Sequence, residues 1–591
     1  MNKKQILCAC FAAAIMFVHL PHVSAEGEET GQLRVVFTGD LNGEIAGHSV
    51  YDEETDTYRN VGGYARLASL IQENKDEHTL VIDAGGHSST SVFDGSTADI
   101  LSTMGYDIIA LGNEDIRYAK EEDALEGVRL LQSGISDFGE KEVIEDINSV
   151  KVGVFSLMGG SALAAVNDPS SNLLEKARKC AASLQEKGAD YVICLFHGNI
   201  PARGKLLKKS GVKGIDLLIC SDAYQNLEEP QKYGDTYIVS AGGYARSLGV
   251  ADIDVEKKEI TSYELVAVDG DIEEKPETLA AVKAYQTQHD QKVKEKFKDL
   301  DRVLGTTDHD LGDPRSEALQ LAQSGTETLL ADAYANAWHL QKHSGSGTAI
   351  SLIPRDTVTG ELLKGDITIK DLADVGVSGR KLVMAFVKGS DLIKLCEIDH
   401  SLGGQDPYFA MSIGNMNYRF LSQRSLYNRI SDVKVQETAG YWARISKDNY
   451  YPVVMTDDMP ARLEAADKVS NGVLNVPLRN VAGQQISSEE LSVLKDYKGE
   501  EIDEMRALDA YITSFNRNEA GVHDISEQYV RNKVVRKEDV LSWRSWFRNT
   551  TAFAGERYKR LGIVIVGGIV ILSVLHAIYK FIRRDHIREL Y

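Results

Sequence analysis

The sequence predicts an α/β protein of two domains that is attached to a membrane. A chain of 591 residues is too long for one hydrophobic core, which favours two domains. From residue 33 onward, short runs rich in Val, Ile and Leu alternate with stretches of helical spacing, as is typical of α/β domains. Each end of the chain carries a longer apolar segment. The composition between them, with 43% hydrophobic and 26% charged residues overall, is that of a globular protein.

The first 25 residues have the parts of a secretory signal peptide. Two lysines precede an apolar run from Ile6 to Leu20, and residues 23–25 form a small-residue cleavage site. The run is shorter than a membrane span, which favours cleavage after Ala25 over an uncleaved anchor. We therefore expect an exported chain that begins at Glu26.

Residues 561–579 form the second apolar segment, which carries no charge. At about 1.5 Å per residue it is roughly 30 Å long, enough to cross a bilayer core. A segment that is apolar on every face favours a transmembrane helix over a buried core helix. Both flanks are basic, so the signal peptide decides the orientation: the body is exported, and residues 580–591 form a cytoplasmic tail. Residues 517–560, which end in a stretch rich in Trp and Arg, are a predicted juxtamembrane stalk.

Charge and cysteine content limit the functional classes. The formal net charge of −22 argues against nucleic-acid binding, which calls for a basic surface. Four cysteines follow the signal peptide, and none forms a close pair in the sequence. Cys194 and Cys220 lie in apolar runs, which favours buried free thiols, whereas export would also permit disulfides.

Seven apolar runs are predicted strands of the first domain: Leu33–Phe37, Thr79–Ile82, Ile108–Leu111, Val150–Leu157, Tyr191–Phe196, Leu217–Cys220 and Tyr237–Val239. Helical spacing predicts helices over Ala65–Asn74 and Asn172–Lys187 between them. A charged helical stretch from Glu273 to Phe297 is a predicted connector, and a second α/β segment follows to about residue 515.

Small and polar residues follow five of these strands. Ligand sites of α/β folds lie beyond the carboxyl ends of strands. Gly, Asn and Asp also make ordinary turns, but five such loops together favour a present or ancestral site. The residues concerned are Asp40, Asn42, Gly86, His87, Asn113, Glu114, His197, Asp222 and Tyr224.

Five further stretches occur in a specific order. Val61 to Ala68 contains Gly62-Gly63-Tyr64-Ala65-Arg66-Leu67-Ala68, and Met104 to Asn113 ends in Ala110-Leu111-Gly112-Asn113. Ala241-Gly242-Gly243-Tyr244 leads to Asp252, Leu329 to Ala333 has the form LxADA, and Gly365 to Val383 completes the set. Together they resemble the calcineurin-like metallophosphoesterase domain and the C-terminal domain of the 5'-nucleotidase family. The resemblance implies a four-layer α/β/β/α sandwich over 33–270, a linking helix over 271–297 and a second α/β, substrate-type domain over 298–516.

This family hydrolyses nucleotides and related phosphate esters with two divalent metals. Two cations clamp the phosphate and ionise the attacking water, which requires a bridging carboxylate. On the resemblance, Asp40, Asn113 and His197 match metal-site positions. Five of the eight positions differ, namely Asn42, Gly86, Glu114, Asp222 and Tyr224. Gly86 stands where the bridging Asp is expected and Glu114 where the catalytic His is expected, so no catalytic residue is assigned and a two-metal site is not expected.

The implied substrate domain also departs from the family pattern. Pro354 to Thr359 replace a Gly-rich loop that begins with Asn and ends with Arg, and Met459 to Glu464 replace a loop that carries one of two base-stacking aromatics. Tyr408 or Phe409 is a candidate for the other aromatic, although Phe409 is equally consistent with a core residue.

Two functions are compatible with these residues. The first is a catalytically silent binding or scaffold module, held at the cell surface by its C-terminal helix and recognising a nucleotide, a phosphate ester or a protein partner. The second is a phosphoesterase acting on nucleotides with one divalent cation. Asp40, Asn42, Asn113, Glu114, Asp222 and His197, with His87 nearby, offer mainly oxygen ligands, which suit Mg²⁺, Mn²⁺ or Ca²⁺. The substitutions favour the first.

Overall fold

A computed structural model describes most of the chain between residues 31 and 529. The described residues are 31–52, 57–89, 91, 93–132, 134, 137–159, 173–198, 213–221, 225–314, 323–341, 348–404, 406–421, 424, 426–437, 441–526 and 529. The predicted signal peptide (1–25), most of the predicted stalk, the predicted transmembrane segment (561–579) and the tail lie outside them. Within the described part of the chain, no helix is both long and apolar enough to cross a bilayer.

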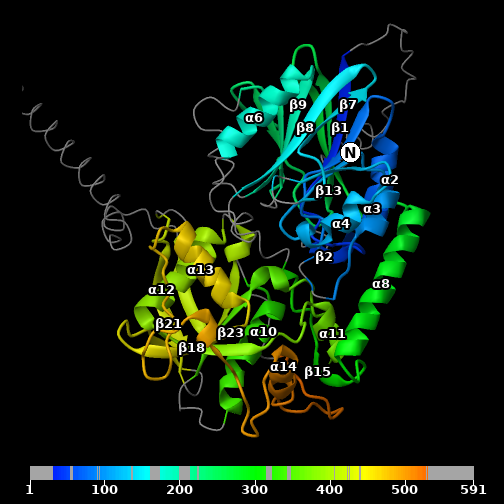
Figure 1. Cartoon of the computed structure of the whole chain (residues 1–591). Coiled ribbons are helices and arrows are strands. Elements are labelled where there is room, and N and C mark those ends of the chain that lie inside the picture. The colour runs from blue at the N-terminus through cyan, green and yellow to red at the C-terminus, as the bar shows by residue number, and fades with distance from the viewer. Residues whose placement is uncertain are drawn as a thin grey trace, which may run out of the picture.

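The first domain is built on two six-stranded sheets (Figure 1). The first sheet has the order β14 (Glu259–Ala267), β13 (Ser247–Asp254), β1 (Gln32–Thr38), β4 (Thr79–Asp83), β5 (Ile108–Ala110) and β6 (Arg129–Leu131). The second has the order β11 (Gln231–Tyr233), β12 (Thr236–Val239), β10 (Leu217–Ser221), β9 (Tyr191–Gly198), β8 (Val150–Gly159) and β7 (Glu142–Ile147). All seven predicted strand runs are confirmed, whereas the hairpin of β13 and β14 was missed.

Three hydrophobic clusters define the layers of this domain. One cluster joins both sheets and contains Phe37, Val154 and Leu195. A second covers the outer face of the first sheet with four helices, namely α2 (Tyr64–Asn74), α3 (Ala98–Met104), α4 (Ala119–Asp123) and α8 (Pro276–Lys296). A third packs α6 (Leu173–Glu186) on the second sheet. Because alternate residues of a strand face opposite sides, each sheet buries both of its faces. The layers therefore run helix, sheet, sheet, helix.

Parallel pairing brings the polar loops together. In the first sheet β1, β4 and β5 are parallel neighbours, and in the second β9 is parallel to β10. The carboxyl ends of parallel neighbours lie at one edge of a sheet. The loops after β1, β4 and β5 therefore adjoin one another and face the ends of β9 and β10.

Helix α8 connects the two domains and is part of both cores (Figure 1). Val282 and Tyr285 belong to the cluster under the first sheet, whereas Val293 and Phe297 belong to the core of the second domain. Phe93 of the first domain joins that second core, with its ring 5.9 Å from that of Phe297. Shared apolar burial at both ends of α8 fixes the domains against each other.

The second domain is centred on a five-stranded sheet with the order β19 (Met411–Gly414), β16 (Ile350–Pro354), β23 (Tyr450–Thr456), β18 (Leu382–Lys388) and β24 (Ser492–Val493). One smaller sheet of this domain pairs β15 (Val303–Thr307) with β17 (Gly365–Thr368), and another joins β20 (Met416–Phe420), β21 (Ile430–Gln436) and β22 (Trp442–Arg444). In the first domain, β2 (His48–Asp52) and β3 (Thr57–Val61) form a separate hairpin. The helices are α10 (Gly325–Asn336), α11 (Ile369–Asp374), α12 (Gly389–Glu397), α13 (Met459–Val469) and α14 (Glu504–Ile512).

Candidate functional site

The loop after β1 rests on the loop after β4 through three backbone hydrogen bonds. The amides of Asp40, Asn42 and Gly43 donate to the carbonyls of Gly85, Gly86 and His87 at 2.9, 2.7 and 3.0 Å. Asp40 and Asn42 both have φ near +52°. Asp and Asn tolerate this left-handed region better than other side-chain-bearing residues, so the sequence fits the turn. Asp40 is thereby buried, with 2% of its surface exposed.

His197 joins the two sheets at this edge. Its Nε2 lies 3.0 Å from Oδ1 of Asn113, at the end of β5, and its Nδ1 lies 2.8 Å from Oγ of Ser221, at the end of β10. Oδ1 of Asp40 lies 3.9 Å from the same Nδ1. Burial lowers the pKa of His197 to about 4, because the charged form loses its hydration. The three residues that match the family pattern, Asp40, Asn113 and His197, therefore meet, around a neutral imidazole.

Gly86 lies against two of these residues. Its φ is +81°, and a Cβ built on it would lie 3.0 Å from Oδ1 of Asp40 and 3.0 Å from Cε1 of His197. A larger side chain requires both a strained backbone and the displacement of one of these groups. The space at position 86 is therefore too small for a larger side chain unless Asp40 or His197 moves.

Asn42 and Asn113 use their side chains within the protein. Nδ2 of Asn42 donates to the backbone carbonyl of Asp40 at 2.6 Å. Nδ2 of Asn113 donates to Oε1 of Glu114 at 3.1 Å, while its Oδ1 faces His197. Both amides stabilise their own loops. Asn113 would have to release His197 before its oxygen could hold a cation, whereas the contact of Asn42 uses its amide nitrogen and not the oxygen that binds cations.

Glu114 faces the second domain. Burial raises the pKa of Glu114, and the nearby carboxylate of Asp356 raises it further, while Arg117 and Arg462 act in the opposite direction. Asp356 follows β16 and Arg462 belongs to α13, so Glu114 lies where the two domains meet. Asp222 and Tyr224, the other two altered positions, lie outside the described residues.

Arg462 occupies the region of the second domain where a stacking aromatic was expected. Its Nη1 donates to Oδ2 of Asp356 at 2.9 Å and to the carbonyl of Tyr408 at 2.8 Å. Its guanidinium also stacks on the Tyr408 ring at 4.5 Å from the centroid, a cation–π contact. Phe409 is 1% exposed and belongs to the core, so its candidacy as a substrate-stacking aromatic is corrected. Of the two candidates, Tyr408 is the one that lies in this region, and Arg462 covers a face of its ring.

The candidacy of His87 as a metal ligand is also corrected. His87 is 0% exposed, and both of its ring nitrogens face a cluster of acids. Its Nδ1 lies 3.1 Å from Asp83, and its Nε2 lies 3.1 Å from Glu122 and 3.5 Å from Asp115. Sequence reasoning missed this cluster, because Asp115 begins a 3-10 helix after β5 and Glu122 belongs to α4, and nothing in their spacing indicates that His87 is their partner.

The donor set does not fit a pair of metal ions. Position 86 offers no ligand atom, and Oδ1 of Asn113 and both ring nitrogens of His197 already have protein partners. Among the described residues, the one group of three His, Cys, Asp or Glu side chains whose ligand atoms converge is His289, Asp290 and Asp374, on the connector and α11. The ammonium of Lys370 lies 3.5 Å from Asp290 and 2.7 Å from Asp374 there, so that acidic group already has a cation.

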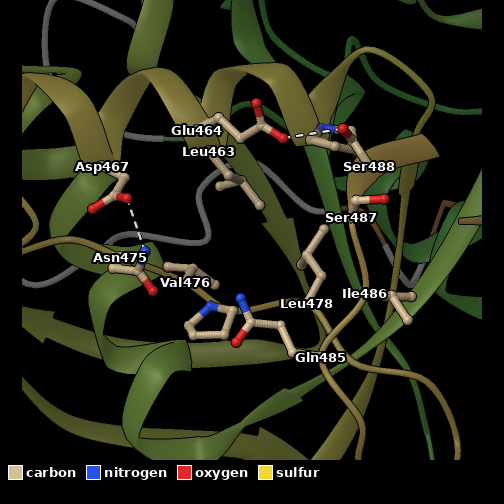
Figure 2. Close-up of a pocket in the computed structure, with 12 residues that line it drawn as sticks. Leu463, Glu464, Asp467, Asn475, Val476, Leu478, Gln485, Ile486, Ser487 and Ser488 are labelled. Carbon is tan, nitrogen blue, oxygen red and sulfur yellow. Dashed lines mark hydrogen bonds between the residues drawn. The ribbon is translucent and has the colours of Figure 1, made fainter. Parts of the chain in front are cut away.

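A cavity of about 170 Å³ lies elsewhere, between α13 and residues 475–488 (Figure 2). Its acidic residues already serve the fold: Asn475 donates to Asp467 at 2.8 Å and Ser488 donates to Glu464 at 3.0 Å. The helix residues that line it, at positions 460, 463, 464 and 467, share one helix face, opposite Arg462. The cavity is therefore separate from the site between the domains.

Comparisons with known proteins identify relatives of both domains. Residues 303–459 match the family model of the 5'-nucleotidase, C-terminal domain. The trifunctional nucleotide phosphoesterase protein YfkN of Bacillus subtilis (strain 168) is 23% identical over 503 residues, which cover 72% of this chain and 33% of that protein. The chain thus spans about a third of the length of this relative.

Solved structures share the fold. The 5'-nucleotidase precursor from Thermus thermophilus has a TM-score of 0.64 at 16% identity, covering 86% of this chain and 100% of that one. The sulfate thiohydrolase SoxB from the same organism has a TM-score of 0.58 at 14% identity, covering 86% and 99%. A putative 5'-nucleotidase from Staphylococcus aureus has a TM-score of 0.52 at 15% identity, covering 83% and 99%.

Proposed function

Because the chain belongs to the 5'-nucleotidase family, we propose that it is a catalytically silent member of it, a binding or scaffold module at the cell surface. One observation carries this proposal. The position where the family resemblance implies a metal-bridging carboxylate is Gly86, and the space around its Cα is filled by Asp40 and His197. Two divalent cations without a shared carboxylate repel each other strongly.

The second domain supports the same proposal. Nucleotide hydrolysis requires a base-binding surface and an excess of positive charge at the phosphate. Here Arg462 is bound to Asp356 and stacks on Tyr408. A base that stacked on the ring face now covered would have to displace that arginine from its carboxylate partner, which makes this face poorly suited to a nucleoside.

A second candidate function is a phosphoesterase that uses one divalent cation. The carboxylates of Asp40 and Glu114 on adjacent loops favour it, since hard cations prefer oxygen ligands. YfkN of Bacillus subtilis is named as a nucleotide phosphoesterase, which makes nucleotides the first substrates to try.

Activity and metal content together separate the two candidates. Full-length protein in detergent is incubated with AMP and with p-nitrophenyl phosphate in the presence of Mg²⁺, Mn²⁺ or Ca²⁺, and its bound metal is measured by elemental analysis. We expect turnover no higher than that of the Asp40→Ala variant, and less than one metal per chain. Hydrolysis that is lost in Asp40→Ala would reject the silent-module proposal and establish the phosphoesterase.

We further propose that the body of the protein is exported and anchored by residues 561–579. The apolar length of that segment and the signal-peptide pattern of residues 1–25 support this. N-terminal sequencing of the mature protein should begin at Glu26. A chain that ends at residue 555 should leave the membrane fraction, and its retention there would contradict the proposed anchor.

A further inference from the structure

A fully buried cluster of one histidine and three acids lies directly beneath the candidate site. His87, Asp83 and Asp115 are each 0% exposed and Glu122 is 1% exposed. Buried ionised groups are costly unless they are paired. The cluster is therefore stable only if its protons and charges are arranged in a specific way.

Hydrogen-bond donors surround two of the acids. Asp115 accepts from the backbone amides of Gly86 and Gly112, each at 2.7 Å, and from that of Ser88 at 2.8 Å. Asp83 accepts from the Thr38 hydroxyl at 2.7 Å and from the Gly85 amide at 2.9 Å. Burial alone would raise the pKa of Asp115, but the nearby His87 and its two glycine amides lower it overall.

The imidazole of His87 faces carboxylate oxygens on both sides. Its Nδ1 is 3.1 Å from Oδ1 of Asp83, and its Nε2 is 3.1 Å from Oε1 of Glu122. A neutral imidazole carries a single N–H, so its other nitrogen would face either an ionised acid or the proton of Glu122, whose pKa is raised by burial. The doubly protonated ring satisfies both contacts and balances part of the negative charge.

Asp115 connects this cluster to the candidate site. The two glycine amides that it binds belong to the loops after β4 and β5. Cβ atoms built on Gly86 and Gly112 would lie 3.0 and 2.8 Å from Cε1 of His197, so these loops form the wall against which His197 rests. We propose that His87 is a positioning residue: as an imidazolium hydrogen-bonded to Asp83 and ion-paired with Glu122, it keeps Asp115 in place under the two loops that frame His197.

The groups around His87 favour a positive charge on its ring. Burial opposes the charged ring, but Asp115, Glu122 and the bond to Asp83 raise the pKa of His87 well above its ordinary value. Tyr64 donates to the backbone carbonyl of His87 at 2.6 Å, and Tyr106 reaches Asp83 through Thr38. Burial raises the pKa of both phenols, so they add no charge. His197 is held neutral by its burial.

The positioning role of His87 rests on the proposed function in one respect: it assumes that no pair of metal ions fixes the loops after β4 and β5. It is tested by the protonation state of His87 and by protection of the loops, neither of which depends on hydrolysis. The full chain, labelled with ¹⁵N-histidine and held in detergent, is titrated between about pH 6 and pH 9 by NMR. We expect both ring nitrogens of His87 to stay protonated at pH 7 and above. A neutral tautomer at pH 7 would overturn the proposal.

Hydrogen exchange at the amides of Gly86 and Gly112 measures how firmly Asp115 holds the two loops. In His87→Gln, we expect the peptides that contain Gly86 and Gly112 to exchange about tenfold faster than in the wild type. His78→Gln is the matched control, because His78 lies in the same domain, partly exposed, and contacts Asn148. Unchanged exchange at both glycines in a folded His87→Gln protein would also refute the role. If His87→Gln does not fold, Glu122→Gln is used instead, because it keeps the imidazole of His87. This variant should shift the Nε2 resonance of His87, which identifies that resonance, and it should also raise hydrogen exchange in the same two peptides.

Discussion

The substitution Gly86→Asp places an acid where the family pattern implies one. We expect it to lower the free energy of unfolding and not to create a metal site. In Gly86→Asp the backbone must hold a side-chain-bearing residue at φ +81°, which costs about 1–2 kcal/mol. The new Cβ also lies 3.0 Å from Asp40 and from His197, and forced contacts of this kind add roughly 1 kcal/mol or more. The added carboxylate is buried beside Asp40, and we expect this charge to cost about 2 kcal/mol further.

Gly86→Ala isolates the backbone and contact costs from the charge. We expect it to lower the free energy of unfolding by about 2 kcal/mol, and Gly86→Asp to lower it by about 4 kcal/mol. Urea unfolding followed by circular dichroism measures both variants at neutral pH. Tryptophan fluorescence does not report on this domain, because all four tryptophans lie at position 338 or beyond. A shift in the midpoint without a change in slope indicates a change in stability.

The charge contribution has a definite pH dependence. A buried carboxyl at position 86 should have a pKa above that of the unfolded chain, so its penalty is absent at low pH and grows as the pH rises from about 4 towards the folded pKa. The difference between the two variants should therefore shrink on acidification. The reasoning is refuted if Gly86→Asp is as stable as Gly86→Ala at neutral pH, or if Mn²⁺ binds it at two ions per chain and restores wild-type stability.

Three further predictions concern buried groups. Since the pKa of His87 is raised in the folded state, its stabilising effect is fully present below about pH 6.5 and is lost as pH rises through the folded pKa; the difference in urea midpoint between wild type and His87→Gln should narrow in alkaline buffer. Glu504→Gln should cost about 3–5 kcal/mol in unfolding experiments, because Glu504 is fully buried and binds the guanidinium of Arg380 at 2.6 Å. Cys180 is partly exposed and should react with a thiol reagent in the native protein, whereas buried Cys194 should react only after unfolding; equal rates would contradict the described packing.

The strands that position the site could be predicted, because each is a short apolar run buried on both faces. The run Leu33–Phe37 became β1 and the run Tyr191–Phe196 became β9, each within two residues at either end. The hairpin of β13 and β14 was missed because β14 is not an apolar run. In β14 most side chains are exposed or half-buried, so hydrophobicity does not mark it, and only pairing with β13 makes it a strand.

Polar partners across the chain could not be predicted in the same way. Asp40 and His197 were expected to converge, since parallel strands present their carboxyl ends at one edge. Nothing in the sequence pairs Arg462 with Asp356, which lies 106 positions earlier. Hydrogen bonds and ion pairs depend on distances of a few tenths of an ångström, which periodicity and composition do not contain.

The charges on the two domains bear on what the site can bind. Glu114 on the first domain and Asp356 and Asp458 on the second face three arginines: Arg462 lies 2.9 Å from Asp356, Arg380 lies 3.5 Å from Asp458, and Arg117 acts on Glu114. Each cation in this set thus has an acid beside it. A phosphate dianion needs unpaired positive charge, from metals or from arginines free to bind it. To enter here it would have to separate an arginine from a half-buried carboxylate, which costs the energy of that ion pair. If the chain is a silent binding module, as proposed, we expect ligands with little net charge, or a protein surface that complements both signs, to bind here more tightly than phosphate esters.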